Sequence, residues 1–100
     1  MGEKANRSGR KTAKQMERHL KGVANHHRIE ILFLIAEREG IFLDEIIRGL
    51  EGNPKTIGEH TRRLFAAGLI NKRYRNKFVE HSLSPYGKTF VRFLKMFQAE

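Results

Sequence analysis

Residues 53–68 read NPKTIGEHTRRLFAAG, and this stretch decides the fold of the chain. Asn53 is a residue type that caps the start of a helix, and Pro54 suits the first helical position, where its missing N–H costs no hydrogen bond. Gly68 can adopt the left-handed conformation that ends many helices. The stretch therefore predicts a helix over residues 54–67.

This predicted helix has one apolar face and one polar face. Ile57, Leu64 and Phe65 recur at core spacing, with Thr61 between them. The opposite face carries small, polar and charged residues, namely Lys55, Thr56, Gly58, Glu59, Arg62 and Arg63. We therefore expect the helix to pack on a core through its apolar face and to expose the other.

The flanking sequence predicts the neighbours of this helix. Residues 69–74 and 78–83 contain β-branched and aromatic residues around a polar tip, which indicates a hairpin. Before the helix 54–67 we expect a helix over 12–23, a helix over 26–38 after Asn25, and a short strand at 41–43 after Gly40. A helix over 45–50, capped by Asp44, and a tight turn at Glu51-Gly52 follow. After the helix 54–67 come the hairpin and a helix over 88–98, which follows Pro85 and Gly87. Two short helices joined by a tight turn and followed by a basic hairpin describe a winged helix-turn-helix, a mainly α fold with a small β-hairpin wing.

The charge of the chain points to a polyanionic partner. Lys and Arg total 20 against 11 acids, for a formal net charge of +9. The excess lies in residues 1–21 and 71–100, whereas residues 22–70 are nearly neutral. This distribution favours nucleic acid first and an anionic membrane surface second, with a merely solubilising surface as the alternative.

The residue types present exclude several classes of site. The absence of Cys excludes disulfides and thiolate metal ligands and fits a reducing compartment. His19, His26, His27, His60 and His81 have no partners at metal-ligand spacing, so we expect no metal site. We find no nucleophile set, carboxylate pair or Gly-rich phosphate loop, and we expect neither an enzyme nor a cofactor nor a small-molecule substrate. Short apolar runs and a polar N-terminus favour no membrane association and a cytoplasmic, nucleoid-associated location.

Three stretches resemble the ArsR-type winged-helix transcription regulators, with the MarR-type regulators second. They are LKGVANHHRIEIL at 20–32, LFAAGLI at 64–70 and SLSPYG at 82–87. The resemblance implies a homodimer that binds double-stranded DNA, with residues 54–67 as the recognition helix in the major groove and residues 71–80 as the wing. Metal-sensing members carry cysteines on the preceding helix, whereas residues 43–48 here have none. The resemblance therefore implies no thiolate sensor site.

The polar face of the recognition helix supplies the candidate contacts with bases. Lys55 and Thr56 lie near the N-terminal end, where side chains reach base edges, and Gly58 would let the backbone approach. Arg62 and Arg63 suit phosphates. Glu59 can accept a hydrogen bond from cytosine or can repel phosphate. His60 matches a family position at the edge of the DNA face, where it would either donate to a phosphate or pack half-buried.

Basic residues also gather on the wing and at the N-terminus. Lys72, Arg73, Arg75 and Lys77 suit phosphate contact or minor-groove insertion, although cations on a hairpin can serve only to prevent strand pairing. Residues 1–11 are predicted to form a flexible basic arm before the domain at 12–100. Lys4, Arg7, Arg10 and Lys11, with Lys14 beyond them, would add sequence-independent affinity or act as a solubility tail.

The first and last helices carry apolar residues beyond the needs of a small core. In the resembling family these helices form the dimer interface, which here would comprise Met16, Leu20, Val23, Phe90, Phe93, Leu94 and Phe97. The alternative is that both helices close the protein's own core.

Taken together, these features favour a sequence-specific, homodimeric DNA-binding regulator that acts as a repressor. One alternative is an architectural protein that coats DNA without sequence preference, because the arm and wing are basic. Another is a winged-helix module that binds RNA or a protein, since a fold alone does not decide function.

Overall fold

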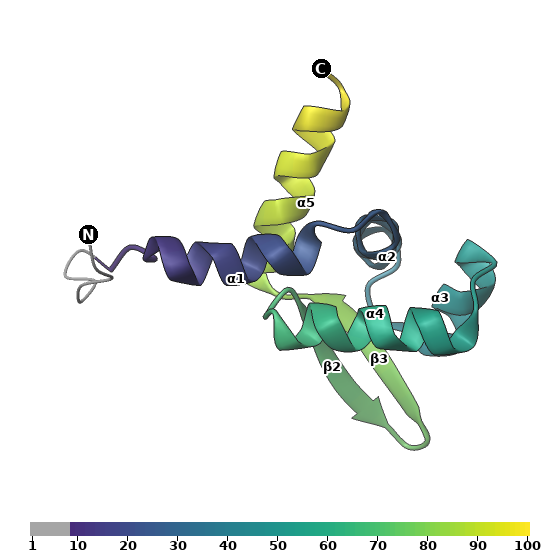
Figure 1. The fold of residues 1–100 in the computed structure, drawn as a ribbon. Coiled ribbons are helices and arrows are strands. Elements are labelled where there is room, and N and C mark those ends of the chain that lie inside the picture. Colours follow the sequence, from purple (N-terminus) through teal and green to yellow (C-terminus); the bar gives the residue numbers. More distant parts are fainter. Residues whose placement is uncertain (1–8) are drawn as a thin grey trace.

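The computed structural model describes residues 9–100. Residues 1–8, which include Lys4 and Arg7 of the predicted arm, lie outside the described residues. The elements run in the order α1 (Ala13–Val23), α2 (His26–Glu37), β1 (Ile41–Phe42), α3 (Leu43–Leu50), α4 (Pro54–Ala66), β2 (Ile70–Arg75), β3 (Phe78–Leu83) and α5 (Pro85–Gln98) (Figure 1). This arrangement confirms the predicted winged helix-turn-helix, in which α3 and α4 form the helix-turn-helix and β2–β3 forms the wing.

The three strands form an antiparallel sheet in the order β1-β3-β2. The register places Ile41 opposite His81 and Lys72 opposite His81 on the two sides of β3. The far ends of β2 and β3 extend away from the helices, below α4 in Figure 1. The short β1 thus anchors the base of the hairpin to the helical body and leaves its tip free to project.

Helix α2 supplies the centre of the core. Ile31, Leu32 and Ile35 on this helix are completely buried. Leu64 of α4 and Leu69 before β2 are completely buried in the same cluster. Because an aliphatic side chain stabilises the fold by roughly 1.5–3 kcal/mol when fully buried, this cluster fixes α4 on the body.

Side-chain caps set the start of both long inner helices, as predicted. The Asn25 side chain accepts hydrogen bonds from the backbone N–H groups of His27 and Arg28. The Asn53 side chain does the same for Lys55 and Thr56. Gly68 has φ +77°, which confirms the left-handed turn after α4. The other predicted bounds shift by one residue, as at Thr12, which caps α1 instead of opening it.

The start of α3 was predicted wrongly. The helix begins at Leu43, with Phe42 as its N-cap, so Asp44 is a helical residue and not the cap. Glu45 Oε1 accepts a hydrogen bond from the backbone N–H of the Phe42 cap at 2.9 Å. Glu45, three residues after the cap, therefore provides the side-chain hydrogen bond at the start of α3, and Asp44 does not cap the helix.

The start of α5 was also predicted too late. Pro85 occupies the first helical turn after the Ser84 cap, whose side chain accepts from Gly87 N. Gly87 lies inside the helix, and this position requires glycine because any Cβ there would collide with the carbonyl oxygen of Leu69. Pro85 and Gly87 therefore begin the helix and allow its close packing, and they do not break the chain.

Phe65 is the third correction. This side chain is half exposed instead of buried in the core, and the ammonium of Lys72 lies 5.3 Å from the centroid of its ring. Leu64 in the same turn of α4 faces the core, whereas the ring of Phe65 lies on the side of the helix near Lys72 of β2.

Among residues 9–100, no helix is long and apolar enough to cross a membrane.

Candidate nucleic-acid interface

The N-terminal half of α4 presents its polar residues to solvent. Lys55, Thr56 and Glu59 are exposed, and the hydrogen bonds of Asn53 hold the first turn in place. Gly58 leaves open space at its position, since the nearest atom to a Cβ there would be Arg62 Nη1 at 3.9 Å. The Thr61 hydroxyl, buried beneath, donates to the carbonyl of Gly58 at 2.8 Å. The N-terminal half of α4 thus exposes hydrogen-bonding side chains and has no side chain at Gly58.

The two arginines of α4 face different neighbours. Arg62 lines a cavity shared with Lys72 and Lys77 of the wing. Arg63 lines a shallow groove on the other side, with Arg18 and Lys21 of α1. The structure therefore brings Arg62 together with the wing and brings Arg63 together with the N-terminal helices.

His60 is held by α2. Its Nδ1 lies 3.1 Å from Arg28 Nη1, and its ring stacks on His27 with centroids 5.2 Å apart. Burial lowers the pKa of His60, and the nearby charge of Arg28 lowers it further. A neutral His60 that accepts a hydrogen bond from Arg28 fits the half-buried packing role better than donation to a phosphate.

The cations of the wing differ in their surroundings. Lys72 is half-buried, and both burial and the neighbouring Arg62 lower its pKa. Arg75 Nη1 lies 3.3 Å from Glu80 Oε2 on the facing strand, so an acid outside residues 71–77 partly neutralises this arginine. Arg73 and Lys77 are exposed, and neither forms an ion pair within the described residues. The unneutralised charge of the wing is thus carried by Lys72, Arg73 and Lys77.

Sequence reasoning missed Arg28, which lies beside α4. Its Nε donates to the carbonyl of Gly22 at 2.7 Å, and its guanidinium lines the same groove as Arg63. Burial and the charge of Arg63 both lower the pKa of Arg28. A basic residue in the first turn of a buried helix was the available signal, but its partner His60 lies 32 residues away.

Two aromatic residues of the wing were read only as strand formers. Tyr74 is 77% exposed and Phe78 is 51% exposed, and they lie near the turn. Exposed aromatic rings among cations are suited to contact sugars or bases. The signal for them was their position next to the polar tip at residues 75–77.

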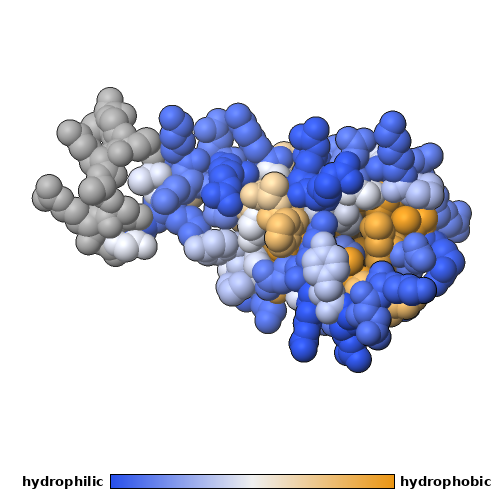
Figure 2. Space-filling model, turned by 90° about the horizontal axis from the view of Figure 1, so that it is seen from below, coloured by the Kyte–Doolittle hydropathy of each residue, from blue (hydrophilic) through white to orange (hydrophobic). Residues whose placement is uncertain are grey.

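The surface seen from the side of α4 and the wing is mostly hydrophilic. Figure 2 shows polar and charged residues over most of this face, with apolar residues gathered toward the end where α3 lies in Figure 1.

Lys11, predicted as part of the arm, is half-buried, with its ammonium 3.6 Å from the centroid of the Tyr86 ring. Arg10 is exposed.

Helices α1 and α5 expose apolar side chains outside this face. Met16, Leu20, Phe93 and Phe97 are each about half exposed or more, and Met96, which was not predicted, is 64% exposed. Val23 was placed wrongly, because it is 6% exposed and belongs to the protein's own core. Phe90 and Leu94 are half-buried and pack against that core.

Three of the histidines contact one another through their rings. The rings of His26 and His27 are tilted with centroids 4.0 Å apart, and the ring of His27 stacks on that of His60. Within residues 9–100, no group of three or more His, Asp or Glu side chains is arranged to hold a metal ion.

Solved structures of several transcription regulators share the fold of this chain. No protein-family model and no curated protein sequence matches the chain. HlyU from Vibrio cholerae superposes with a TM-score of 0.79 at 25% identity, over 88% of this chain and 96% of that chain. The homodimeric winged helix-turn-helix DNA-binding domain of Mb0332 from Mycobacterium bovis, a possible ArsR-family regulator, gives 0.80 at 21% identity, over 100% of this chain and 92% of that chain. The repressor PagR of Bacillus anthracis gives 0.74 at 16% identity, over 81% and 93%.

The protein therefore has a winged helix-turn-helix fold of the kind seen in these regulators. The resemblance read from residues 20–87 agrees with the solved structures that share the fold.

Proposed function

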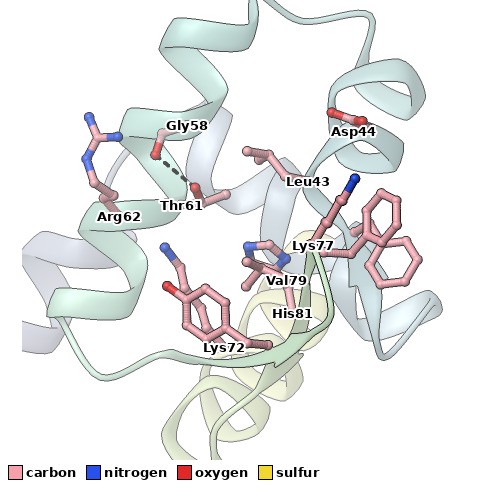
Figure 3. A pocket seen from close by; sticks show the side chains of 12 residues that line it. Leu43, Asp44, Gly58, Thr61, Arg62, Lys72, Lys77, Val79 and His81 are labelled. Atoms are coloured by element: carbon pink, nitrogen blue, oxygen red, sulfur yellow. Dashed lines mark hydrogen bonds between the residues drawn. The ribbon is translucent and has the colours of Figure 1, made fainter.

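We propose that this protein is a homodimeric transcription regulator that binds double-stranded DNA in a sequence-specific way and acts as a repressor. The observation that carries the proposal is the exposed face of α4, where Lys55, Thr56 and Glu59 are open to solvent on the helix whose Arg62 lines a cavity with Lys72 and Lys77 of the wing (Figure 3). A helix of this kind suits the major groove, and an adjacent basic hairpin suits the backbone or the minor groove. The solved structures that share the fold include DNA-binding regulators and a repressor.

The division of labour within this face follows from the side chains. Lys55 and Thr56 would read base edges, and Glu59 would accept from cytosine N4 because it forms no ion pair within the described residues. Arg62 would reach a phosphate from the wing side of α4, and Arg63 would reach one beside Arg18 and Lys21. Base contacts would set the preferred sequence, and phosphate contacts would set the register.

The dimer rests on the apolar surface of α1 and α5. Leu20 on α1 and Phe93, Met96 and Phe97 on α5 would bury their side chains against a second copy. Contiguous exposed apolar side chains of this size mark interaction surfaces in soluble proteins. Two copies would place two recognition helices in successive major grooves, about one turn of DNA apart.

Non-specific coating of DNA is the second candidate, because Arg73 and Lys77 remain unneutralised on the wing. The deciding experiment is selection of bound fragments from a random duplex pool at about 150 mM salt, where non-specific electrostatic binding is weakened. We expect enrichment of a two-fold related motif with half-sites about 10 base pairs apart. Retention of DNA without any motif would replace the regulator with the coating protein.

A further inference from the structure

Three arginines line one shallow groove between the end of α1, the start of α2 and α4. They are Arg18 of α1, Arg28 of α2 and Arg63 of α4, and none of them forms an ion pair with a carboxylate within residues 9–100. Figure 1 shows the end of α1 above the C-terminal end of α4, which brings these elements together. Lys21 also lines the groove, but it is paired with Glu17 at 3.1 Å. The groove therefore concentrates positive charge that attracts an anion.

Arg28 is held at the edge of this groove by three neighbours. Its Nε donates to the carbonyl of Gly22 at 2.7 Å, and its Nη2 donates to the carbonyl of Lys21 at 3.4 Å. Its Nη1 lies 3.1 Å from Nδ1 of His60. A guanidinium can only donate, so Nδ1 must be the acceptor, and the proton of the neutral imidazole must be on Nε2. This third bond therefore exists only while His60 is neutral.

Positive charge surrounds His60 on two helices. Arg28 and His27 of α2 lie beside it, and the ring of His27 stacks on it with centroids 5.2 Å apart. Arg63 and the carboxylate of Glu59 act on it from α4. Burial, followed by the charges of Arg28, His27 and Arg63, lowers the pKa of His60, and Glu59 opposes this effect. An anion in the groove would also raise this pKa, because nearby negative charge favours the protonated ring.

We propose that Arg28 is a further phosphate-binding residue and that a proton on His60 releases it for this role. A protonated His60 carries a hydrogen on Nδ1, so it cannot accept from Arg28, and the two cations repel each other. A phosphate oxygen that enters between them would accept from both, with Arg63 beside it. Binding of the phosphate group thus takes up a proton, and by reciprocity acidification strengthens binding. This role rests on the proposed function, because the phosphate group would belong to the DNA backbone.

The first test examines the groove without DNA. Sulfate is the probe because it keeps both of its charges between pH 5.5 and 7.5, and chloride at equal ionic strength is the matched control. The His60 ring is followed by NMR as the pH changes, and we expect sulfate to strengthen its proton binding roughly tenfold. Arg63→Gln should reduce this effect, whereas Arg48→Gln, at an exposed position on α3, should not. The same pKa of His60 in sulfate and in chloride would overturn the proposal.

The second test asks whether DNA supplies the phosphate group. Affinity for a duplex from the fragment selection is measured at pH 6.0 and 7.2, and we expect binding about threefold tighter at pH 6.0. His60→Gln keeps an acceptor for Arg28 but does not titrate, so the difference should disappear. His26→Gln removes an exposed histidine of α2 and should preserve the difference. A pH dependence that survives in His60→Gln would overturn the role of this proton.

A third test addresses Arg28 itself. Arg28→Lys keeps the charge but loses the planar set of donors, so we expect sulfate and duplex to bind at least threefold more weakly at pH 6.0. If this variant unfolds early in a thermal melt, Arg18→Gln tests the opposite wall of the groove. Weaker sulfate binding with unchanged duplex affinity would overturn the assignment to DNA and indicate a free phosphate compound. Failure to bind any duplex at either pH would instead refute the proposed function, and the sulfate titration would then decide whether Arg28 and His60 form an anion site.

Discussion

The imidazole Nδ1 of His19 on α1 lies 2.6 Å from the carbonyl oxygen of Ala67, the residue that follows α4. Next to it, Arg18 Nη2 donates to the carbonyl of Ala66 at 3.2 Å. The last carbonyls of a helix have no partner within the helix, and cationic or donor side chains there stabilise its end. Helix α1, which carries part of the proposed dimer surface, therefore holds the C-terminal end of α4.

We expect His19→Ala to destabilise the protein by about 1–3 kcal/mol, because it removes a buried hydrogen bond and leaves the Ala67 carbonyl without its donor. Urea unfolding followed by circular dichroism measures the change. His26→Ala is the matched control, since His26 is exposed and a surface substitution usually changes stability by less than about 0.5 kcal/mol. Equal losses in the two variants would show that the bond from α1 to Ala67 contributes nothing particular.

Two glycines give opposite expectations for the same substitution. Gly87→Ala places a methyl group against the carbonyl oxygen of Leu69, a backbone atom that cannot move aside cheaply, so we expect a loss of several kcal/mol or failure to fold. Gly58→Ala meets open space within a helix, so we expect a gain of about 0.5–1 kcal/mol. Thermal unfolding of both variants checks the pair. A stable Gly87→Ala protein would mean that α5 packs less closely on Leu69 than described.

These examples show which features the sequence predicts and why the others escape it. Local signals such as the Asn53 cap and the left-handed Gly68 depend on a few neighbouring residues, and both were predicted correctly. Phe65 was misplaced because its spacing suits the core, whereas its half-exposed position beside Lys72 of the wing depends on tertiary packing. His19 and Ala67 are 48 residues apart, so no local pattern indicates their contact.

The candidate site divides in the same way. The polar face of α4 follows from helical periodicity alone, and the basic character of the wing follows from the residue types around the hairpin tip. The pairing of Arg75 with Glu80 depends on strand register, and the crowding of Lys72 against Arg62 depends on how the wing folds back toward α4. Periodicity predicts which side chains share an element, but it does not predict which elements face each other.

Acidic pH should weaken the fold through the buried His81. His81 is 2% exposed, and burial lowers its pKa below the ordinary 6.5, despite the hydrogen bond from its Nδ1 to the carbonyl of Ile41 at 3.1 Å. The unfolded chain therefore binds protons more readily below about pH 6.5 than the folded chain does. Stability should be level above about pH 7 and decrease toward pH 5.5, by at most about 1.4 kcal/mol per pH unit for one histidine.

Urea unfolding at pH 7.5 and 5.5 measures this dependence. In His81→Gln the side chain no longer titrates but keeps an amide donor for Ile41, so we expect most of the pH dependence to disappear. A smaller remainder should come from His60, whose pKa is also lowered by burial and by Arg28. An unchanged pH dependence in His81→Gln would assign the effect to other groups.

The wing and the recognition helix should respond differently to substitution when DNA is bound. Lys77→Ala should reduce the slope of log affinity against log salt by about 0.9 per protomer and weaken all sequences alike. Arg75→Ala should reduce it less, because Glu80 already partly neutralises Arg75. Lys55→Ala or Thr56→Ala should instead change the preferred sequence in a repeated fragment selection. The same uniform loss in all four variants would contradict the division between base and phosphate contacts.

The apolar surface of α5 should decide the oligomeric state. Phe93 and Phe97 are 50% and 63% exposed, and their rings stack with centroids 5.8 Å apart, so together they present one continuous apolar surface. Because about half of each ring is already covered, burying the rest against a second copy would contribute roughly 1 kcal/mol per ring, whereas a carboxylate at either position would have to be buried without a partner. We therefore expect Phe93→Glu and Phe97→Glu to shift the sedimentation mass from twice the chain mass to 11.7 kDa.

Gln98→Glu makes the same change of charge at an exposed position on the same helix, and it should leave the dimer intact. The two Phe variants should keep their helical circular dichroism spectrum, because neither ring belongs to the buried core. As monomers they should bind a single half-site but lose the steep gain in affinity that a two-fold related site gives a dimer. Dimers of unchanged mass in both variants would place the contact between copies elsewhere, and the spacing of half-sites would then have to follow from that other surface.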